Sequence, residues 1–298
     1  MTHKHPVWFD SHRPMSFGLM LPVREGTMGG ETPRFNDLVV MAHAAKDAGF
    51  EALWFGDHLS YQQHGETVGT WEAFTLMAGV AATVPDMVIG PLVSCTGLRN
   101  PALLAKMAET LDEISDGRFV LGIGAGWNQP EYEQFGYPFD HRASRFEESI
   151  AIISEMLRTG ESTYAGRFAQ TAGAENRPRG PRPQGLPILV GSNGDRLVHS
   201  VARYADAWNS DWQQQPEDYL PLLAKLDAAC DAEGRPRESL IKTGSVRFTA
   251  DISVEKRTAY THAVQQLGLR HLVIGLEPRT LASVQDFGNV IALHDSMN

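Results

Sequence analysis

Short apolar runs alternate along the chain with stretches in which hydrophobic residues recur at helical spacing, and this pair of patterns repeats eight times. The apolar runs predict eight β-strands at residues 17–21, 52–56, 87–95, 119–123, 187–191, 207–209, 241–248 and 271–276. A predicted helix follows each strand. Eight alternating units in one chain favour an α/β fold of the (β/α)8 TIM-barrel type over a doubly wound sheet.

The third predicted helix carries the clearest boundary signals. Asn100 suits the N-cap, Pro101 suits the first helical position, and Gly117 suits the residue beyond the helix end. No second core is indicated elsewhere in the chain. We therefore expect a flexible N-terminal tail at residues 1–15 and a single barrel domain at residues 16–298.

Composition narrows the classes of function. A hydrophobic content of 42% in 298 residues is enough for one large core, and no apolar run is long enough to span a membrane. The net charge of −10 argues against a nucleic-acid partner, because neutralising phosphates needs a basic field. Two cysteines and an opening segment without signal-peptide layout indicate a reducing, cytoplasmic setting.

Polar residues gather directly after the predicted strands, where a TIM barrel carries its binding and catalytic groups. In strand order they are Arg24, Glu25, Asp57, His58, residues 94–99, residues 124–128, Ser192, Asn193, Gly194, Asn209 and Asp211. No set has the spacing of a zinc site, and no Gly-x-Ser-x-Gly nucleophile motif occurs. The pattern predicts a cofactor platform without a metal.

The fourth predicted strand runs into Gly124 and Gly126, and a buried strand that ends in glycines lets another group approach its backbone. Trp127 and Asn128 follow, and they would supply a stacking wall and an amide contact for a flat ligand. The alternative is that Trp127 covers the end of the barrel without touching a ligand.

Two further motifs each have two possible interpretations. Asp57 and His58 form an ionisable pair suited to proton transfer near neutral pH, or else Asp57 caps a turn and His58 is an ordinary hydrogen-bonded side chain. The turn Gly191, Ser192, Asn193 and Gly194 precedes a predicted helix at 195–204. It is either a phosphate site at a helix N-terminus or a plain strand-to-helix connection.

Five stretches carry a family resemblance, and they cover most of residues 16–210 in order. They are FGLMLP, GFEALWFGDH, RNPALLAKMAETLDEISDGRFVLGIGAGWNQPEYEQFG, RFEESIAIISEMLRTGE and LPILVGSNGDRLVHSVARYADAWN. At these residues the chain resembles the bacterial luciferase-like superfamily of flavin- and deazaflavin-dependent oxidoreductases. The resemblance implies a (β/α)8 barrel, a small-molecule substrate and a homodimer.

The GAGWN and RNPALLAKMA segments are most similar to the subgroup that uses coenzyme F420, a deazaflavin that carries hydride. The resemblance implies that Asp57 and His58 lie beside the cofactor ring. It also implies that Leu92, Val93 and Ser94 back the other face of the ring, with a non-proline cis peptide between Leu92 and Val93. For the anionic tail of the cofactor we expect the turn 191–194, with Arg196 as the local cation.

One departure from the family bears on the substrate. The sugar-phosphate dehydrogenase branch places a catalytic glutamate after the glycine turn, where this chain has Trp127. Oxidation of glucose 6-phosphate is therefore not expected. Glu131 and Glu25 are candidate replacement acids, and Arg24 joins them as a candidate substrate residue.

The sequence thus predicts an F420-dependent oxidoreductase that moves hydride to or from a small organic substrate, with His58 as the proton donor or acceptor. The first alternative is a monooxygenase that uses reduced FMN and oxygen, because both cofactors have a flat tricycle and a phosphate-bearing tail. The second is a barrel that binds a flavin without turnover.

Overall fold

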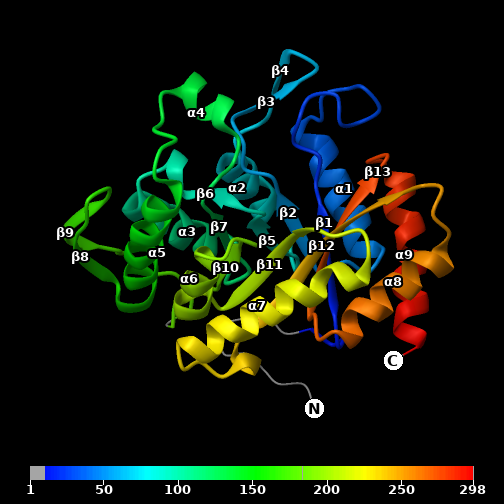
Figure 1. Ribbon diagram of the computed structural model, residues 1–298. Helices are drawn as coiled ribbons and strands as arrows, with labels where there is room; N and C mark the ends of the chain where they lie inside the picture. Colours follow the sequence, from blue (N-terminus) through cyan, green and yellow to red (C-terminus); the bar gives the residue numbers. More distant parts are fainter. Residues whose placement is uncertain (1–10, 183, 298) are drawn as a thin grey trace.

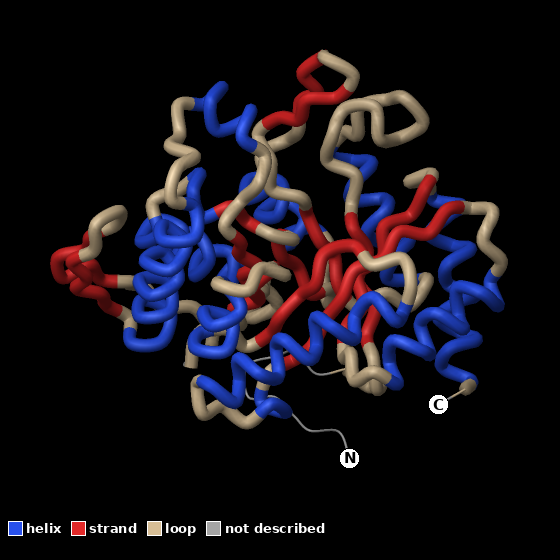
Figure 2. Tube along the Cα trace, in the orientation of Figure 1, coloured by secondary structure: helices blue, strands red, loops and turns tan. Residues whose placement is uncertain are grey.

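The computed structural model describes residues 11–182 and 184–297, and a ring of parallel strands enclosed by helices forms its centre (Figures 1 and 2). The strands of the ring are β1 (Ser16–Met20), β2 (Ala52–Phe55), β5 (Val88–Pro91), β6 (Ser94–Cys95), β7 (Leu121–Gly124), β10 (Ile188–Gly191), β11 (Ala207–Trp212), β12 (Ile241–Thr249) and β13 (His271–Glu277). They follow chain order around the ring, and β13 pairs with β1.

The ring closes at its third position, where the predicted strand 87–95 is split into β5 and β6. β6 pairs with β7, and the Ile89 and Val120 amides donate to the carbonyls of Arg118 (3.1 Å) and Ile89 (2.9 Å). Eight strand positions therefore form a closed barrel, which confirms the predicted fold. The prediction of one continuous third strand over residues 87–95 was wrong, because Leu92 and Val93 lie outside the strand pairing.

An outer layer of helices covers the barrel (Figure 1). The helices that follow the eight strand positions are α1 (Phe35–Asp47), α2 (Ala73–Thr83), α3 (Pro101–Ile114), α5 (Arg142–Thr159), α6 (Leu197–Tyr204), α7 (Tyr219–Ala232), α8 (Val254–Gln266) and α9 (Leu281–Ser296). Short 3₁₀ turns lie at Thr96–Leu98, Pro216–Asp218 and Arg237–Ser239. The Asn100 cap of α3 is confirmed, because its side chain accepts from the amides of Ala102 and Leu103.

The barrel interior holds its own apolar cluster, separate from the larger one between strands and helices. Its members are Met20, Ala52, Trp54, Val88, Val120, Leu189, Ala207 and Val273. Near the amino ends of the strands, Trp54 Nε1 donates to Nε2 of the buried His271 (2.9 Å). Burial lowers the pKa of His271 to about 3, so the imidazole stays neutral and its Nδ1–H faces the Ser16 hydroxyl at 2.7 Å.

Three insertions that the sequence did not predict are added to the eight units. A hairpin of β3 (Ser60–Gln63) and β4 (Glu66–Gly69) follows β2, and α4 (Gln129–Phe135) follows β7. Figure 1 shows both above the carboxyl ends of the strands, which we call the barrel mouth. A second hairpin, β8 (Glu161–Ala165) and β9 (Gln170–Glu175), follows α5 on the outside.

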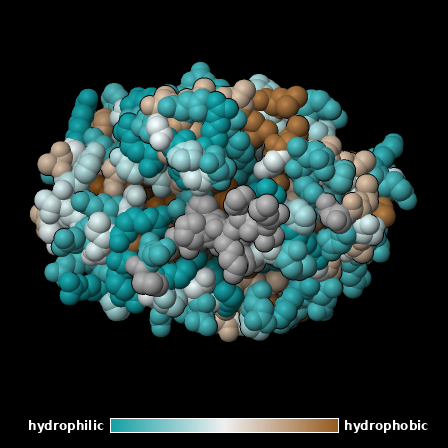
Figure 3. Space-filling view, turned by 90° about the horizontal axis from the view of Figure 1, so that it is seen from below, coloured by the Kyte–Doolittle hydropathy of each residue, from teal (hydrophilic) through white to brown (hydrophobic). Residues whose placement is uncertain are grey.

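The chain before β1 is packed where it is described. Ser11 donates to Glu51 (2.9 Å), Arg13 pairs with Asp295 (2.8 Å), and Met15 is fully buried. The remainder of the expected tail, residues 1–10, lies outside the described residues. The face in Figure 3, seen from below, carries mainly hydrophilic side chains around the grey atoms. None of the described helices is long and apolar enough to cross a membrane.

Candidate active site

His58 lies three residues beyond β2 and is bound by a glutamate from α4. Its Nδ1 is 2.9 Å from Glu131 Oε1, and Oε2 of the same carboxylate accepts the Leu59 amide at 2.9 Å. Glu131 is 1% exposed, so the contact is shielded from water. Because a carboxylate accepts hydrogen bonds, Nδ1 is the donor and Nε2 is the ring nitrogen left for other chemistry.

Asp57, the neighbour of His58, belongs to a different network. Both of its oxygens accept from Arg99, at 2.6 and 2.9 Å, and the Ser94 hydroxyl donates to Oδ2 at 2.9 Å. Burial lowers the pKa of Arg99, but the charges of Asp57 and Glu72 outweigh it and raise the pKa above its ordinary value. Asp57 thus anchors β6 and Arg99, and Glu131 is the residue that orients His58.

Aromatic side chains line the mouth beside His58. The Tyr61 ring, from β3, lies 4.3 Å from the His58 ring, and the Trp127 ring lies 5.5 Å from it. Burial raises the pKa of Tyr61 to about 12 although the nearby Arg24 lowers it, so its hydroxyl keeps its proton at neutral pH. Trp127 is 64% exposed, which leaves one face open. The three rings form a polar and aromatic wall.

The floor of the mouth is apolar and partly exposed. Leu92, Val93 and Trp212 are partly buried against the inner cluster of the barrel. The peptide bond between Leu92 and Val93 is cis, as the family resemblance implies. A flat, largely apolar ring could rest on this floor with one edge toward His58.

The glycines at the strand ends make room for neighbouring protein atoms. A Cβ on Gly124 would lie 2.8 Å from Val93 Cγ2, and one on Gly191 would lie 3.0 Å from Val93 Cγ1. A Cβ on Gly126 would collide with the Tyr132 hydroxyl and with Cys95 Sγ. The close approach that the glycine pattern predicts is therefore made by the chain itself, and a direct cofactor contact at Gly124 and Gly126 stays a prediction.

Cys95 is a buried thiol behind the floor. Its sulfur is 2.6 Å from the Tyr132 hydroxyl, and burial raises the pKa of Cys95 to about 11. A thiol with a pKa this high stays protonated near neutral pH and is a poor nucleophile.

The turn after β10 was predicted as the phosphate site, and the structure shows which side chains contact it. Ser192 Oγ accepts the Gly194 amide (3.2 Å), and Lys225 from α7 lies 3.1 Å from the Asn193 carbonyl and 2.5 Å from Asp195. α6 begins at Leu197, two residues after the expected start. Lys225 is thus a second cation at this turn, and Asp195 pairs with it.

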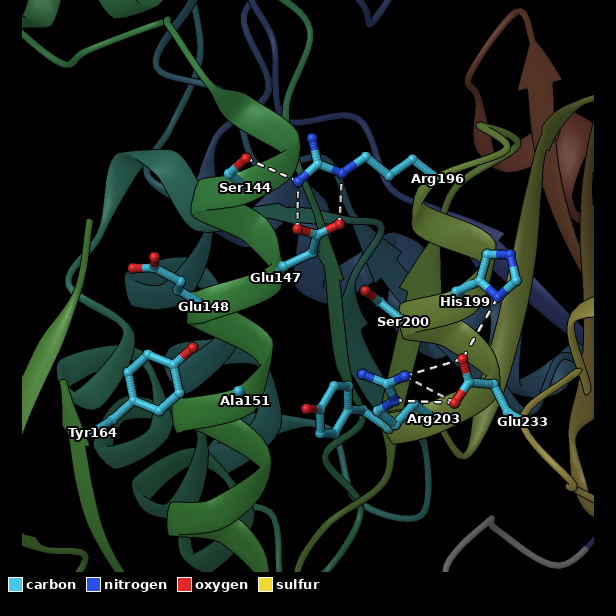
Figure 4. A pocket seen from close by; sticks show the side chains of 11 residues that line it. Ser144, Glu147, Glu148, Ala151, Tyr164, Arg196, His199, Ser200, Arg203 and Glu233 are labelled. Atoms are coloured by element: carbon cyan, nitrogen blue, oxygen red, sulfur yellow. Dashed lines mark hydrogen bonds and ion pairs between the residues drawn. The ribbon is translucent and has the colours of Figure 1, made fainter. Parts of the chain in front are cut away.

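Arg196 faces away from the turn. It pairs with Glu147 of α5 (2.5 Å) and donates to Ser144 (2.8 Å), as Figure 4 shows. Helices α5 and α6 border a groove of about 580 Å³ on the outside of the barrel. In the same groove Arg203 pairs with Glu233 (2.9 Å). Arg196 is thus engaged by Glu147 in this groove, and its role as the local cation for the cofactor tail stays a prediction.

The remaining predicted site residues are either buried supports of the mouth or partly exposed side chains near the first hairpin. Ser94 and Asn128 are buried and hold other parts of the mouth, because the Asn128 amide donates to the Ser60 carbonyl at 2.8 Å. Arg24 stacks over Tyr61 with its guanidinium carbon 5.0 Å from the ring centroid. Glu25 is exposed and accepts the Gly69 amide (2.5 Å), so it holds the hairpin. Among the described residues no group of three His, Cys, Asp or Glu side chains could hold a metal ion.

Several residues of the mouth escaped the sequence prediction. The predicted rim stops at the sixth strand, so it misses Arg247 on β12 and Arg279 after β13. Searching for polar residues at the carboxyl ends of the last two strands as well would have found both arginines. Tyr61 gives no such signal, because a tyrosine in an unpredicted hairpin has no characteristic spacing.

Comparisons with known proteins agree with this geometry. The model of the luciferase-like monooxygenase family matches residues 15–286. Pyrimidine monooxygenase RutA of Serratia proteamaculans is 35% identical over 173 residues, which are 55% of this chain and 46% of that protein. The chain thus spans about half the length of the pyrimidine monooxygenases it matches.

Two further relatives have a different activity in their names. The 5,10-methylenetetrahydromethanopterin reductase of Archaeoglobus fulgidus is 26% identical over 248 residues, covering 83% of this chain and 69% of the reductase. The solved structure of the coenzyme F420 dependent tetrahydromethanopterin reductase of Methanopyrus kandleri superposes with a TM-score of 0.75 at 16% identity, over 94% of this chain and 99% of that one. At that identity the likeness concerns the fold.

Proposed function

The chain belongs to the luciferase-like monooxygenase family and is an oxidoreductase, and from this premise we propose that it transfers hydride between coenzyme F420 and a small organic substrate at the barrel mouth. One observation carries the proposal: His58 is held by a buried glutamate beside a half-open apolar floor. Binding alone needs no oriented proton-transfer group. This arrangement therefore favours an enzyme over a non-catalytic flavin-binding barrel.

The residues present fit a flat cofactor with an anionic tail. The floor of Leu92, Val93 and Trp212 matches a largely apolar tricycle, and the wall of His58 and Tyr61 supplies polar groups at its edge. The turn 191–194, with Lys225 beside it, suits the phosphate. When bound, the deazaflavin supplies the site that gives or accepts hydride.

In this proposal the protein's own groups move the proton and hold the ring. His58 Nε2 gives a proton to the substrate oxygen or takes one from it as the bond order changes. Glu131 keeps the His58 ring in place through Nδ1 and stabilises the imidazolium when it forms.

The match to pyrimidine monooxygenases favours a second candidate, a monooxygenase that uses reduced FMN and oxygen. The same floor and turn would accept an FMN ring and phosphate. Direct titration of the purified protein with F420, FMN and NADPH, each in both redox states, separates the candidates. We expect F420 to bind most tightly, with micromolar or better affinity. Saturable FMN binding without F420 binding would replace the proposal by the second candidate.

A matched pair of cation removals tests the phosphate position. Lys225→Ala is expected to weaken binding of the cofactor about fivefold, the equivalent of about 1 kcal/mol, because an exposed cation and a helix N-terminus share the anion. Arg196→Ala removes an equal charge from the outer groove and should leave the dissociation constant unchanged. Calorimetric titration of both variants checks this. An effect of Arg196→Ala larger than that of Lys225→Ala would place the tail on the outer groove.

A further inference from the structure

Three arginines reach the barrel mouth from three neighbouring strands. Arg24 lies four residues beyond β1, Arg247 lies on β12, and Arg279 lies two residues beyond β13. β13 pairs with β1 on one side and with β12 on the other. Arg247 belongs to the same side of β12 as Thr243 and Ser245, whose hydroxyls contact the buried Asn209. Its guanidinium therefore lies over the interior of the barrel.

The charges of these arginines are not matched. Among residues 11–182 and 184–297, none of the three has a carboxylate within ion-pair distance. Arg24 stacks on Tyr61, and Arg247 lies 4.6 Å from the Trp212 ring centroid. Other arginines of this acidic chain have a partner of their own: Arg99 pairs with Asp57 (2.6 Å) and Arg158 with Asp206 (2.5 Å), whereas Arg118 donates to backbone carbonyls.

The charges of Arg24 and Arg247 act on Arg279. Burial, together with the charges of Arg24 and Arg247, lowers the pKa of Arg279, and Glu277 only partly offsets this. Glu131 is the other acid near Tyr61, and it is engaged by His58 and Leu59. Three like charges with one nearby free acid leave a positive surplus that a bound anion would relieve.

The position of the cluster separates it from the proposed cofactor tail. Counted around the eight strand positions, β12, β13 and β1 lie opposite β5 with β6, β7 and β10, which carry Leu92, Val93 and the turn 191–194. Trp212, on β11, lies between the two sides and borders Arg247. Figure 1 shows β12 and β13 on the other side of the barrel from β6 and β7. A group held by the arginines would face the cofactor ring across the mouth.

We propose that Arg24, Arg247 and Arg279 form the substrate anion site, and that the substrate of this oxidoreductase is a small organic carboxylate or phosphate ester. Guanidinium groups bind both anions with paired hydrogen bonds. The apolar faces of Tyr61 and Trp212 beside two of the arginines would contact the body of such a molecule. This inference rests on the proposed function, because it names the class of its substrate.

Anion binding can be measured without any cofactor. Thermal unfolding of the protein is followed in sodium chloride and in rising concentrations of sodium phosphate or sodium benzoate at equal ionic strength. A ligand that binds only the folded state raises the melting temperature in a way that gives its dissociation constant. We expect saturable stabilisation of the wild type by both anions.

Substitution locates the site. Arg279→Met and Arg247→Met should each weaken anion binding by about tenfold or more, because each removes a charge-assisted hydrogen bond. Arg279→Met should also raise the melting temperature in chloride, because it relieves repulsion. Arg167→Met is the matched control, since Arg167 also stacks on an aromatic ring, Phe168, without an ion pair in the described part of the chain. Equal anion affinity in Arg167→Met and Arg279→Met would overturn the proposal.

Two more measurements separate this site from the cofactor tail. If Lys225→Ala abolishes the phosphate effect and Arg279→Met does not, the anion binds at the turn 191–194 and the proposal fails. If Arg279→Met weakens F420 or FMN binding about tenfold, the arginines hold the cofactor and the substrate assignment fails. Because the melting experiments contain no cofactor, a protein that binds neither F420 nor FMN would refute the proposed function alone.

Discussion

Replacing His58 with alanine is expected to lower turnover by about 10²–10⁴-fold, the range for a positioned general acid or base. His58 is held through Nδ1 by the buried carboxylate of Glu131, so its loss removes the proton path and leaves the floor intact. Cofactor affinity should change far less. Steady-state rates with an identified substrate, together with cofactor titration, check both parts.

A companion substitution tests how His58 is oriented. Glu131→Gln keeps the size of the side chain but replaces one acceptor oxygen with an NH₂ group, so either Nδ1 of His58 or the Leu59 amide loses its partner. We expect kcat to fall by about 10- to 100-fold, as for a lost charge-assisted hydrogen bond, with little change in KM. His43→Ala, on the exposed face of α1, is the control. Near wild-type turnover in His58→Ala would make His58 a structural residue.

Arg99→Ala is expected to destabilise the protein by about 3–5 kcal/mol, because it leaves a buried carboxylate without its cation. Asp57 is 1% exposed and Arg99 10% exposed, and both Asp57 oxygens depend on the pair. Urea unfolding followed by circular dichroism gives the free energy of unfolding. The effect should appear in the absence of any ligand.

The exposed pair of Lys46 and Asp86 provides the comparison for Arg99. Its N–O distance is also short, 2.8 Å, but the side chains are 38% and 76% exposed. Lys46→Ala should therefore change the free energy of unfolding far less than Arg99→Ala. If Arg99→Ala proved no more destabilising than Lys46→Ala, Asp57 would not be the structural anchor described above, and a catalytic role for it would return.

The barrel was predictable from the sequence because each strand and helix carries its own local signal. Apolar runs, the Asn100 cap and the Gly117 stop depend on neighbours within a few residues. The pairing of His58 with Glu131 was not predictable in this way. It joins residues 73 positions apart, through a short helix with no strong period of its own.

The cation beside the turn 191–194 was also difficult to predict, because it comes from a distant part of the sequence. Sequence distance suggested Arg196 as its cation because that residue adjoins the turn. Arg196, the residue before α6, pairs with Glu147 of α5, whereas Lys225, 32 residues past Asn193, reaches the turn from α7. Which cation serves a turn depends on side-chain direction, and that direction follows from packing between elements.

The space beside Gly124 and Gly191 is limited by one side chain, that of Val93 between β5 and β6. A methyl group at either glycine would press on Val93 unless position 93 became smaller in the same lineage. These three columns should therefore covary in an alignment of relatives, with bulk at one column matched by its loss at another. A variant library built on this scaffold would need to mutate all three positions at once to reshape the floor of the mouth.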